Sequence, residues 1–302
     1  MPARFVLSFD CEGKWGSADG LTAGDRRDLK DQKLRDAYGA ILSVLDEYRI
    51  EATFAFAGAF SQSASGFARI RPAIEALASE APDYLRPALR DIDETGGEGW
   101  HGAALVEAVG TARMQHEIAL HGVTHIPWTQ MDPAFVDTEL GLFESLEGPV
   151  RSSRTFVYPR NRVAHVDALE ARGFLGFRAA PPDRSRFRSF LSEFNLFDQP
   201  EQEQRREGIL AIPAGYFLNW RSGARRLVPP AITKLRAKRL LDGAAATNAV
   251  VHYWLHPENI ATAPSTLQLL DTLVREVAAR RDAGHCVVLT QLGYCRSTES
   301  PS

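Results

Sequence analysis

The stretch F-V-L-S-F-D-C-E-G, residues 5–13, opens a pattern that repeats along the chain. Its apolar run from Phe5 to Asp10 predicts a short buried strand with two acids at its end. A polar loop follows, and residues 33–48 then place apolar side chains at helical spacing. Strand, loop and helix in this order form the building unit of an α/β fold.

The same unit recurs through the rest of the sequence. Asp132 and Pro133 have the cap-then-proline pattern of a helix start, and Ser265 with Gln268 predicts a capping box ahead of a helix that Gly284 ends. Repeated alternation predicts an α/β fold with a parallel sheet, and this many units predict a closed or nearly closed barrel. We expect one domain, 1–302, with excursions near 61–110 and 181–245. The expected strands are 52–57, 117–120, 155–158, 174–178, 209–212, 250–255 and 287–290.

Composition and charge narrow the class of protein. The 302 residues are 44% hydrophobic and 24% charged, which is typical of a globular chain that can bury a core. A net charge of −3 argues against a nucleic-acid binder. The N-terminus has no apolar leader, no run approaches a membrane span, and three cysteines show no disulfide framework. We therefore expect a cytoplasmic protein without a transmembrane segment, although a chain whose signal peptide had been removed would look the same.

One basic run departs from this composition. Residues 221–239 are rich in arginine and lysine, and they are interpreted as a solvated helix or an excursion. A lipid- or phosphate-binding role is the alternative interpretation of the run.

The strongest local motif is H-G-V-T-H, residues 121–125, directly after an apolar strand. Two histidines four residues apart can converge on one metal if the chain turns into a helix, because positions i and i+4 share a face. The alternative is one core histidine, His121 or His125, and one at the surface.

The acids at the end of the first strand form a second motif. Alternation along a strand puts Asp10 and Glu12 on one side and Cys11 on the other. Two such carboxylates can divide two tasks, one holding a metal and the other handling protons, or they can cap the loop that follows.

Two further strands end in polar residues. T-F-V-Y-P-R-N presents Arg160 and Asn161, and V-H-Y-W-L-H-P-E-N carries His252 and ends at His256. Five residues fall at or just beyond the carboxyl ends of predicted parallel strands, which is the rim where barrel active sites form: Asp10, Glu12, His121, Arg160 and His256.

In these motifs and their order the sequence resembles the polysaccharide deacetylases, the NodB-homology domain of carbohydrate esterase family four. S-F-D-C-E-G stands where that family has T-F-D-D-G, A-T-F-A-F matches A-T-F-F, and H-G-V-T-H matches H-S-x-x-H. F-V-Y-P-R-N occupies the place of R-x-P-Y-G, and W-L-H-P that of L-x-H. The resemblance implies a distorted parallel (β/α) barrel. It also implies Asp10 as catalytic base, His256 as general acid, and Glu12, His121 and His125 as metal ligands.

The sequence departs from the family pattern at three points. Its first motif is D-x-E, and no D-x-x-D-W motif is found, although residues 214–220 could form the equivalent wall. The family's arginine precedes its proline, whereas Arg160 follows Pro159. We expect Arg160 to approach Asp10 and keep that carboxylate ionised.

These motifs predict a metal-dependent hydrolase that removes an N-acyl group, acetyl or possibly formyl, from an amino sugar. The expected metal is divalent, with zinc first and cobalt, manganese, nickel or iron as alternatives. The expected substrate is a free, nucleotide-linked or lipid-linked amino sugar used in bacterial surface polysaccharide synthesis. A backbone N–H near Tyr158 is expected to stabilise the oxyanion. Candidate aromatic residues for contact with the sugar are Trp15, Trp128, Tyr158, Tyr216, Trp220 and Trp254.

Other classes of protein remain open at this stage. A carbohydrate O-acetyl esterase would use the same site, and a metal-free carbohydrate-binding protein could share the fold. Two histidines and a carboxylate also occur in non-haem iron oxygenases, although the alternating α/β pattern argues against that scaffold. Cys11 could instead be a thiol nucleophile.

Overall fold

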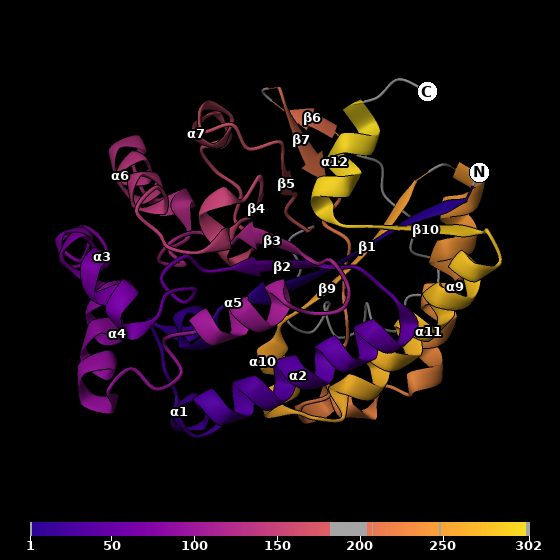
Figure 1. Ribbon diagram of the computed structural model, residues 1–302, viewed down its shortest axis with the longest axis horizontal. Helices are drawn as coiled ribbons and strands as arrows, with labels where there is room; N and C mark the ends of the chain where they lie inside the picture. The colour runs from indigo at the N-terminus through magenta and orange to yellow at the C-terminus, as the bar shows by residue number, and fades with distance from the viewer. Residues whose placement is uncertain (1, 182–203, 207, 248, 300–302) are drawn as a thin grey trace.

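The computed structural model describes residues 2–181, 204–206, 208–247 and 249–299. It confirms the predicted α/β fold: a curled, half-barrel sheet of parallel strands wrapped by helices, with the order β6-β7-β5-β4-β3-β2-β1-β9-β8 and β10 beside β1 (Figure 1). Only the β6–β7 pair in this sheet is antiparallel, within the described residues. The strands are β1 Ala3–Cys11, β2 Thr53–Phe56, β3 Glu117–Leu120, β4 Thr155–Val157, β5 Gly176–Arg178, β6 Gln204–Arg206, β7 Ile209–Ile212, β8 Tyr216–Phe217, β9 Val250–Leu255 and β10 Cys286–Leu289.

Strand β1 is the centre of the sheet. It pairs with β9 on one edge and with both β2 and β10 on the other. Phe5, Leu7, Phe9 and Cys11 belong to the main hydrophobic core, and the intervening side chains take the opposite face, as strand alternation requires. Because this strand is buried on both faces, its acid at position 10 points into the protein and not to bulk water.

Helices cover the outside of the sheet (Figure 1). Helix α2, Asp31–Tyr48, contacts α10 and α11 through its buried apolar stripe, and α9 packs against β1 and α11. The helices are α1 Ala23–Asp28, α2, α3 Ala64–Leu77, α4 Pro82–Thr95, α5 Ala103–Gly110, α6 Pro133–Phe143, α7 Val166–Ala171, α9 Pro230–Thr247, α10 Pro257–Thr262, α11 Thr266–Asp282 and α12 Gln291–Glu299. Short 3-10 turns are η1 Gly13–Ser17, η2 Trp128–Gln130, η3 Pro149–Ser152, η4 Pro159–Asn161 and η5 Gly223–Leu227.

The inside of the half-barrel is apolar at one end and polar at the other. At the amino ends of the strands a small apolar cluster contains Val6 and Val250 together with Tyr294 from α12, a helix that the sequence pattern did not predict. Above this cluster lie buried polar side chains, and the carboxyl ends of β1, β3 and β9 carry the acids and histidines. The apolar cluster therefore closes one end and leaves the polar end for a site.

One local detail differs from the predictions. The predicted capping box at Ser265 is wrong: this residue has helical angles, and its side chain makes no cap hydrogen bond. Gly284 does adopt the left-handed conformation (φ 75°) expected after a helix end.

The excursion near 61–110 consists of α3, α4 and α5, whereas the one near 181–245 includes sheet strands β7 and β8 and lies partly outside the described residues. Among the described residues, no helix is long and apolar enough to cross a membrane.

Candidate metal and catalytic site

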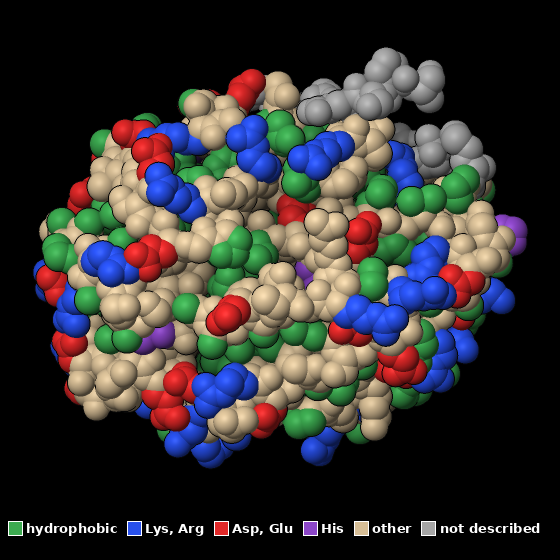
Figure 2. All heavy atoms as spheres, in the orientation of Figure 1, with side chains coloured by type: hydrophobic (Ala, Val, Ile, Leu, Met, Phe, Trp, Pro, Cys, Tyr) green, Lys and Arg blue, Asp and Glu red, His purple; other side chains and the backbone are tan. Residues whose placement is uncertain are grey.

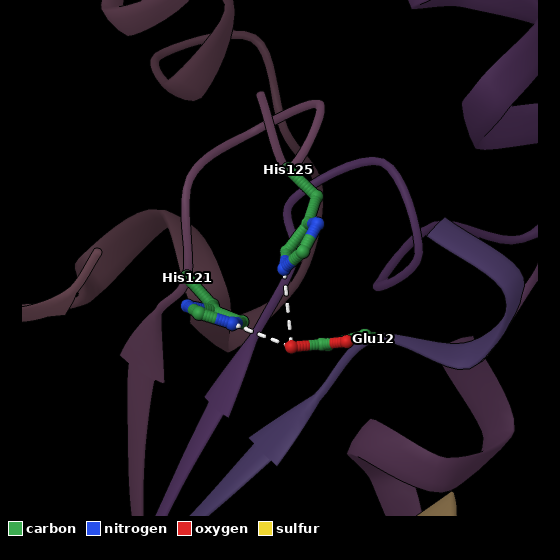
Figure 3. A group of neighbouring side chains, drawn as sticks. All are labelled: Glu12, His121 and His125. Carbon is green, nitrogen blue, oxygen red and sulfur yellow. Dashed lines mark hydrogen bonds and ion pairs between the residues drawn. The ribbon is translucent and has the colours of Figure 1, made fainter. Parts of the chain in front are cut away.

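Glu12, His121 and His125 converge at the carboxyl ends of β1 and β3 (Figure 3). The Oε1 atom of Glu12 lies 2.9 Å from Nε2 of His121 and 3.0 Å from Nε2 of His125. Both imidazoles are almost fully buried, and the side chain of Glu12 is 13% exposed. The three residues predicted as metal ligands are thus brought together by the fold.

The histidines reach this position through a loop and not through the helix that the four-residue spacing suggested. Gly122 and His125 both have positive φ angles, 66° and 61°, which fold the segment back on itself. A Cβ atom at Gly122 would lie 2.8 Å from Pro159, so the close approach of these two loops requires glycine. The left-handed backbone conformation of His125 costs free energy, which a bound ligand can offset.

The buried side chain of Glu139 fixes the shape of this loop. Oε1 of Glu139, on α6, accepts hydrogen bonds from the backbone N–H of Val123 and Thr124 and from the hydroxyl of Thr124. Its other oxygen accepts the indole N–H of Trp128. Glu139 is 0% exposed, so these hydrogen bonds form away from bulk water, where the low local dielectric strengthens them.

The hydrogen bonds of His121 support a metal site. Its Nδ1 lies 2.8 Å from the carbonyl oxygen of Val157, which can only accept, so Nδ1 carries a proton and Nε2 faces Oε1 of Glu12. The close approach of Nε2 to a carboxylate oxygen requires a proton or a metal cation between the two atoms. Burial lowers the pKa of His125 and outweighs the opposing charge of Glu12, which favours the neutral imidazole that binds metal. Two imidazole nitrogens and one carboxylate oxygen suit a divalent metal such as zinc.

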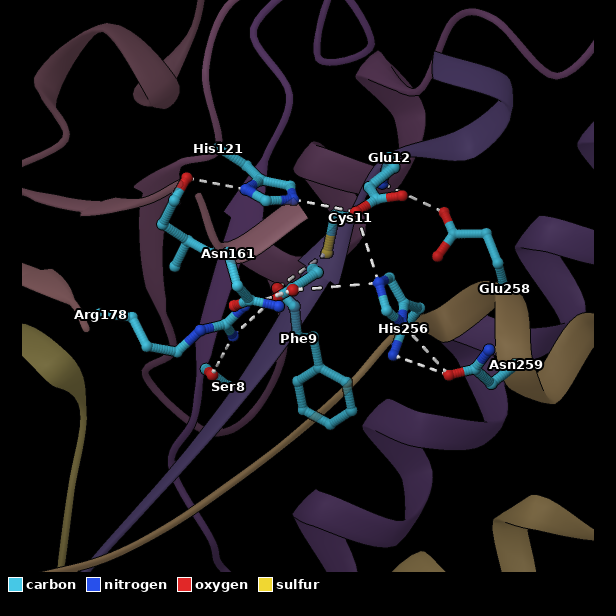
Figure 4. Close-up of polar contacts among 12 residues, drawn as sticks. Ser8, Phe9, Cys11, Glu12, His121, Asn161, Arg178, His256, Glu258 and Asn259 are labelled. Atoms are coloured by element: carbon cyan, nitrogen blue, oxygen red, sulfur yellow. Dashed lines mark hydrogen bonds and ion pairs between the residues drawn. The ribbon is translucent and has the colours of Figure 1, made fainter. Parts of the chain in front are cut away.

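Asp10 lies beside this group and is paired with Arg178. Figure 4 shows Arg178 reaching toward Ser8 and Asn161. The guanidinium donates two hydrogen bonds to the carboxylate, 2.6 Å from NH1 to Oδ1 and 2.5 Å from NH2 to Oδ2. Burial alone would raise the pKa of Asp10, but the charge of Arg178 and of neighbouring histidines holds it below its usual value. Asp10 is therefore an ionised carboxylate inside the half-barrel.

The expected contact between Arg160 and Asp10 is not formed. Arg160 instead pairs with Asp19 and stacks on Tyr84, with its guanidinium 5.3 Å from the ring centre. The reason is local: Arg160 has φ 54° within η4, and this turn directs the chain toward the outer rim. Arg178, at the end of β5, takes the inward position next to Asp10.

Ser8 and His252 hold Arg178 on the side that faces the amino ends of the strands. Its NH1 lies 3.3 Å from the hydroxyl of Ser8, which in turn lies 2.8 Å from Nε2 of His252. Nδ1 of His252 donates to the carbonyl of Pro213 at 2.8 Å, so Nε2 accepts the Ser8 proton and the Ser8 oxygen is left to accept from Arg178. The guanidinium also bonds Asn161 and lies 4.5 Å from the ring centre of Trp254.

His256 completes the group from β9. Its Nε2 lies 3.4 Å from Oε1 of Glu12 and 3.9 Å from Oδ2 of Asp10, while Nδ1 is 3.3 Å from Asn259. Burial would lower the pKa of His256, but the negative charges of Glu12 and Asp10 raise it to about 9. The carboxylate that we expected near His256 is therefore chiefly Glu12.

Glu258 supports the loop that carries Glu12. Its Oε1 accepts the backbone N–H groups of Glu12 at 3.2 Å and Gly13 at 2.6 Å. Burial and the nearby charge of Glu12 raise the pKa of Glu258 to about 7. The sequence motif L-H-P-E-N contained this residue, but nothing in the sequence alone indicated that it contacts the first strand.

The predicted aromatic residues divide into two groups. Trp15, Trp128 and Tyr158 are fully buried and pack in the core, so they do not offer a face to a sugar. Trp254 and Tyr216 are 9% exposed, and Trp220 is half-buried. Cys11 is fully buried on the opposite face of β1, where burial raises its pKa, and this argues against a nucleophilic thiolate.

Similarity to known proteins comes from structure alone. No family model matches the sequence, and no curated protein matches it. A protein from Mycobacterium smegmatis assigned as a polysaccharide deacetylase superposes with a TM-score of 0.59 at 16% identity, covering 100% of this chain and 93% of that chain. The chain has the fold of the polysaccharide deacetylases. A Pseudomonas aeruginosa PAO1 protein with the same assignment gives a TM-score of 0.54 at 14% identity, and the Puue allantoinase gives 0.54 at 16%; both superpositions cover 97% of this chain and 90% of the other.

Sequence reasoning missed two residues of the deacetylase-fold site for different reasons. Arg178 ends a predicted apolar strand, so a charge at that position was a signal that could have been used. Glu139 lies within a predicted helix among apolar neighbours, and its contact with the histidine loop depends on how α6 packs.

Proposed function

We propose that this chain is a metal-dependent hydrolase that removes an N-acyl group from an amino sugar. The observation that carries the proposal is one cluster: two histidines and a carboxylate suited to a metal, beside a buried ionised carboxylate and a cationic histidine. Hydrolysis of an amide requires a polarised carbonyl, a base and an acid, and these groups supply each requirement.

Each residue has a distinct role in this proposal. Glu12, His121 and His125 hold the metal, which when bound polarises the acyl oxygen and lowers the pKa of water. Asp10 removes a proton from the attacking water, and Arg178 keeps the carboxylate ionised and oriented. As the C–N bond breaks, Nε2 of His256 gives its proton to the departing amine. The products are a carboxylic acid and a free amino sugar.

The finer points of the proposal concern metal and substrate. We propose zinc because two imidazoles and one carboxylate match its common catalytic ligand set. The proposed substrates are amino sugars, free or linked to a nucleotide or lipid carrier, with acetyl or formyl as the acyl group. Trp220 and Trp254 are proposed to contact the sugar, and Arg160 at the outer rim is proposed to contact substrate and not Asp10.

The test combines metal analysis with activity. Wild-type protein reconstituted with zinc should hold about one metal per chain, and His121→Ala should lose it. The wild type should release acetate or formate from N-acylated amino sugars, and Asp10→Asn should keep its metal but lose turnover. A wild type that never holds metal would refute the proposal, and release from O-acetylated sugars alone would show a carbohydrate esterase instead.

A further inference from the structure

The segment from Arg221 to Leu241 contains seven basic residues and no acidic residue, in a chain of net charge −3. It forms η5 and most of α9. Three large apolar side chains are markedly exposed among the residues that the structure describes, and two of them belong to this segment: Leu227 at 73% and Leu235 at 38%. Cationic and exposed apolar side chains therefore occur together here.

Several cations of this segment are open to solvent. Arg226, Lys234 and Lys238 are exposed, and they form no ion pair within the part of the chain that the structure describes. Neighbouring α11 behaves differently, because Arg275 pairs with Asp271 and Arg280 with Asp242 and Glu276. Figure 2 shows Lys and Arg side chains gathered at the right of the view, where Figure 1 places α9 and α11, with acids between them. The net positive charge of this surface comes from α9 and η5.

The segment begins beside the catalytic rim. Strand β8 ends at Phe217, and the guanidinium of Arg225 lies 5.7 Å from the centre of that ring. The same ring lies 6.1 Å from the imidazole of His256. Leu227 is thus carried on a turn that is packed against a wall of the site.

We propose that Arg221–Leu241 is a docking surface for an anionic lipid membrane. Lysine and arginine attract anionic headgroups, while Leu227 at the tip of η5 and Leu235 on α9 can enter the boundary between headgroups and acyl chains. A nucleic acid would use the cations but would leave both leucines in water. The combination of the three exposed cations Arg226, Lys234 and Lys238 with exposed leucines selects the lipid surface as the partner.

Docking in this way would place the catalytic rim at the membrane. A lipid-linked amino sugar would then present its sugar to Asp10 and His256 while its lipid stayed in the bilayer, a consequence that rests on the proposed function. Membrane binding itself does not depend on catalysis, so the two proposals can fail separately.

The test is sedimentation of the full chain with vesicles of phosphatidylcholine alone or with phosphatidylglycerol in a ratio of about two to one. Wild-type protein should bind the anionic vesicles and not the neutral ones, and binding should weaken with added salt. Arg226→Glu combined with Lys234→Glu should lower binding by at least about 25-fold, since each cation contributes about 5-fold near such a surface. Leu227→Ser should weaken binding without changing its dependence on salt.

The matched control is Arg90→Glu combined with Arg151→Glu, which makes the same change in net charge at two other exposed arginines. This control should bind as the wild type does, and circular dichroism should show that all variants fold. Equal losses in the two double variants would overturn the proposal, because general electrostatics would then explain the binding. Failure of the wild type to bind anionic vesicles would overturn it as well, and so would binding to RNA alone.

Discussion

At the scale of single residues, the site is built around a buried charge and its partner. Asp10 is 2% exposed, and a carboxylate in such a place is stable only if its charge is compensated. Arg178 compensates it through two hydrogen bonds, and Ser8 and Asn161 fix the guanidinium in turn. The arginine therefore holds the ionised state and the orientation of the proposed base together.

Arg178→Met should destabilise the fold by about 3–5 kcal/mol, because it leaves Asp10 buried without a partner. Adding Asp10→Asn to this variant should recover part of the loss, since the uncompensated charge is then gone. Urea unfolding of the two single variants and the double variant measures this coupling. The exposed pair gives the control: Arg160→Met should change stability by less than about 1 kcal/mol. Strictly additive effects at Arg178 and Asp10 would contradict the expectation.

His252 should make stability depend on pH. Burial and the charge of Arg178 lower its pKa to about 3 in the folded protein, against about 6.5 when unfolded. Folding therefore favours the neutral ring, and this contribution is present above pH 6.5 and is lost as pH falls toward 3.

At pH 4.5 the loss from His252 should be about 2–3 kcal/mol, which is roughly two pKa units. His252→Gln is the matched comparison, because its amide can accept from Ser8 and donate to Pro213 but does not titrate. Urea unfolding of both proteins at pH 7 and pH 4.5 gives the difference. If the two proteins lost stability in parallel, His252 would not be the group that titrates.

At the scale of elements, the loop 121–128 shows what sequence patterns can and cannot predict. The motif H-G-V-T-H and the strand before it predicted that His121 and His125 lie close together, as they do. The helix that we expected to align them is wrong, because Gly122 and the left-handed His125 turn the chain instead. The four-residue spacing indicated that the two histidines converge, whereas the path of the loop depends on Glu139 from α6, the helix that follows the loop.

Glu139→Gln should lower zinc affinity by about 10–100-fold, the usual cost of losing a group that orients ligands. The amide must place an N–H group against donors that now bind a carboxylate, so Val123, Thr124 or Trp128 loses its acceptor. Competition with a chromophoric chelator measures the affinity. Glu144→Gln, on an exposed residue just after α6, should leave zinc affinity unchanged. Equal affinities in wild type and Glu139→Gln would show that the loop is rigid without this carboxylate.

The two arginines show a second limit at this scale. Arg160 follows β4 and Arg178 ends β5, at the same rim of the sheet. The sequence favoured Arg160 because it lies next to Pro159 in the motif F-V-Y-P-R-N. Whether an arginine points inward depends on the turn after its strand, and η4 has left-handed residues at positions 160 and 161 that carry the first side chain outward. The positions of these two strands along the chain were predictable from the hydrophobic pattern, but the backbone angles of the turns that follow them were not.

At the scale of the whole molecule, the site joins segments that are far apart in sequence. Glu12 follows β1, His121 and His125 follow β3, and His256 follows β9. A metal held by Glu12 and the two histidines after β3 stabilises the folded chain and not the unfolded one, because the unfolded chain has no assembled site. Metal binding should therefore be visible as a change in global stability.

Zinc at about 100 times its dissociation constant should raise the free energy of unfolding by about 2.7 kcal/mol. The increase should vanish on chelation and be absent in His125→Ala. Trp220→Ala is the control variant, because a change at a proposed sugar contact should leave the stabilisation by zinc intact even if turnover falls. Urea unfolding monitored by tryptophan fluorescence, with and without zinc, gives each value. A wild type whose stability ignored zinc would mean that the three donors do not form one site in solution, and the roles assigned to Asp10 and His256 would then lose their basis.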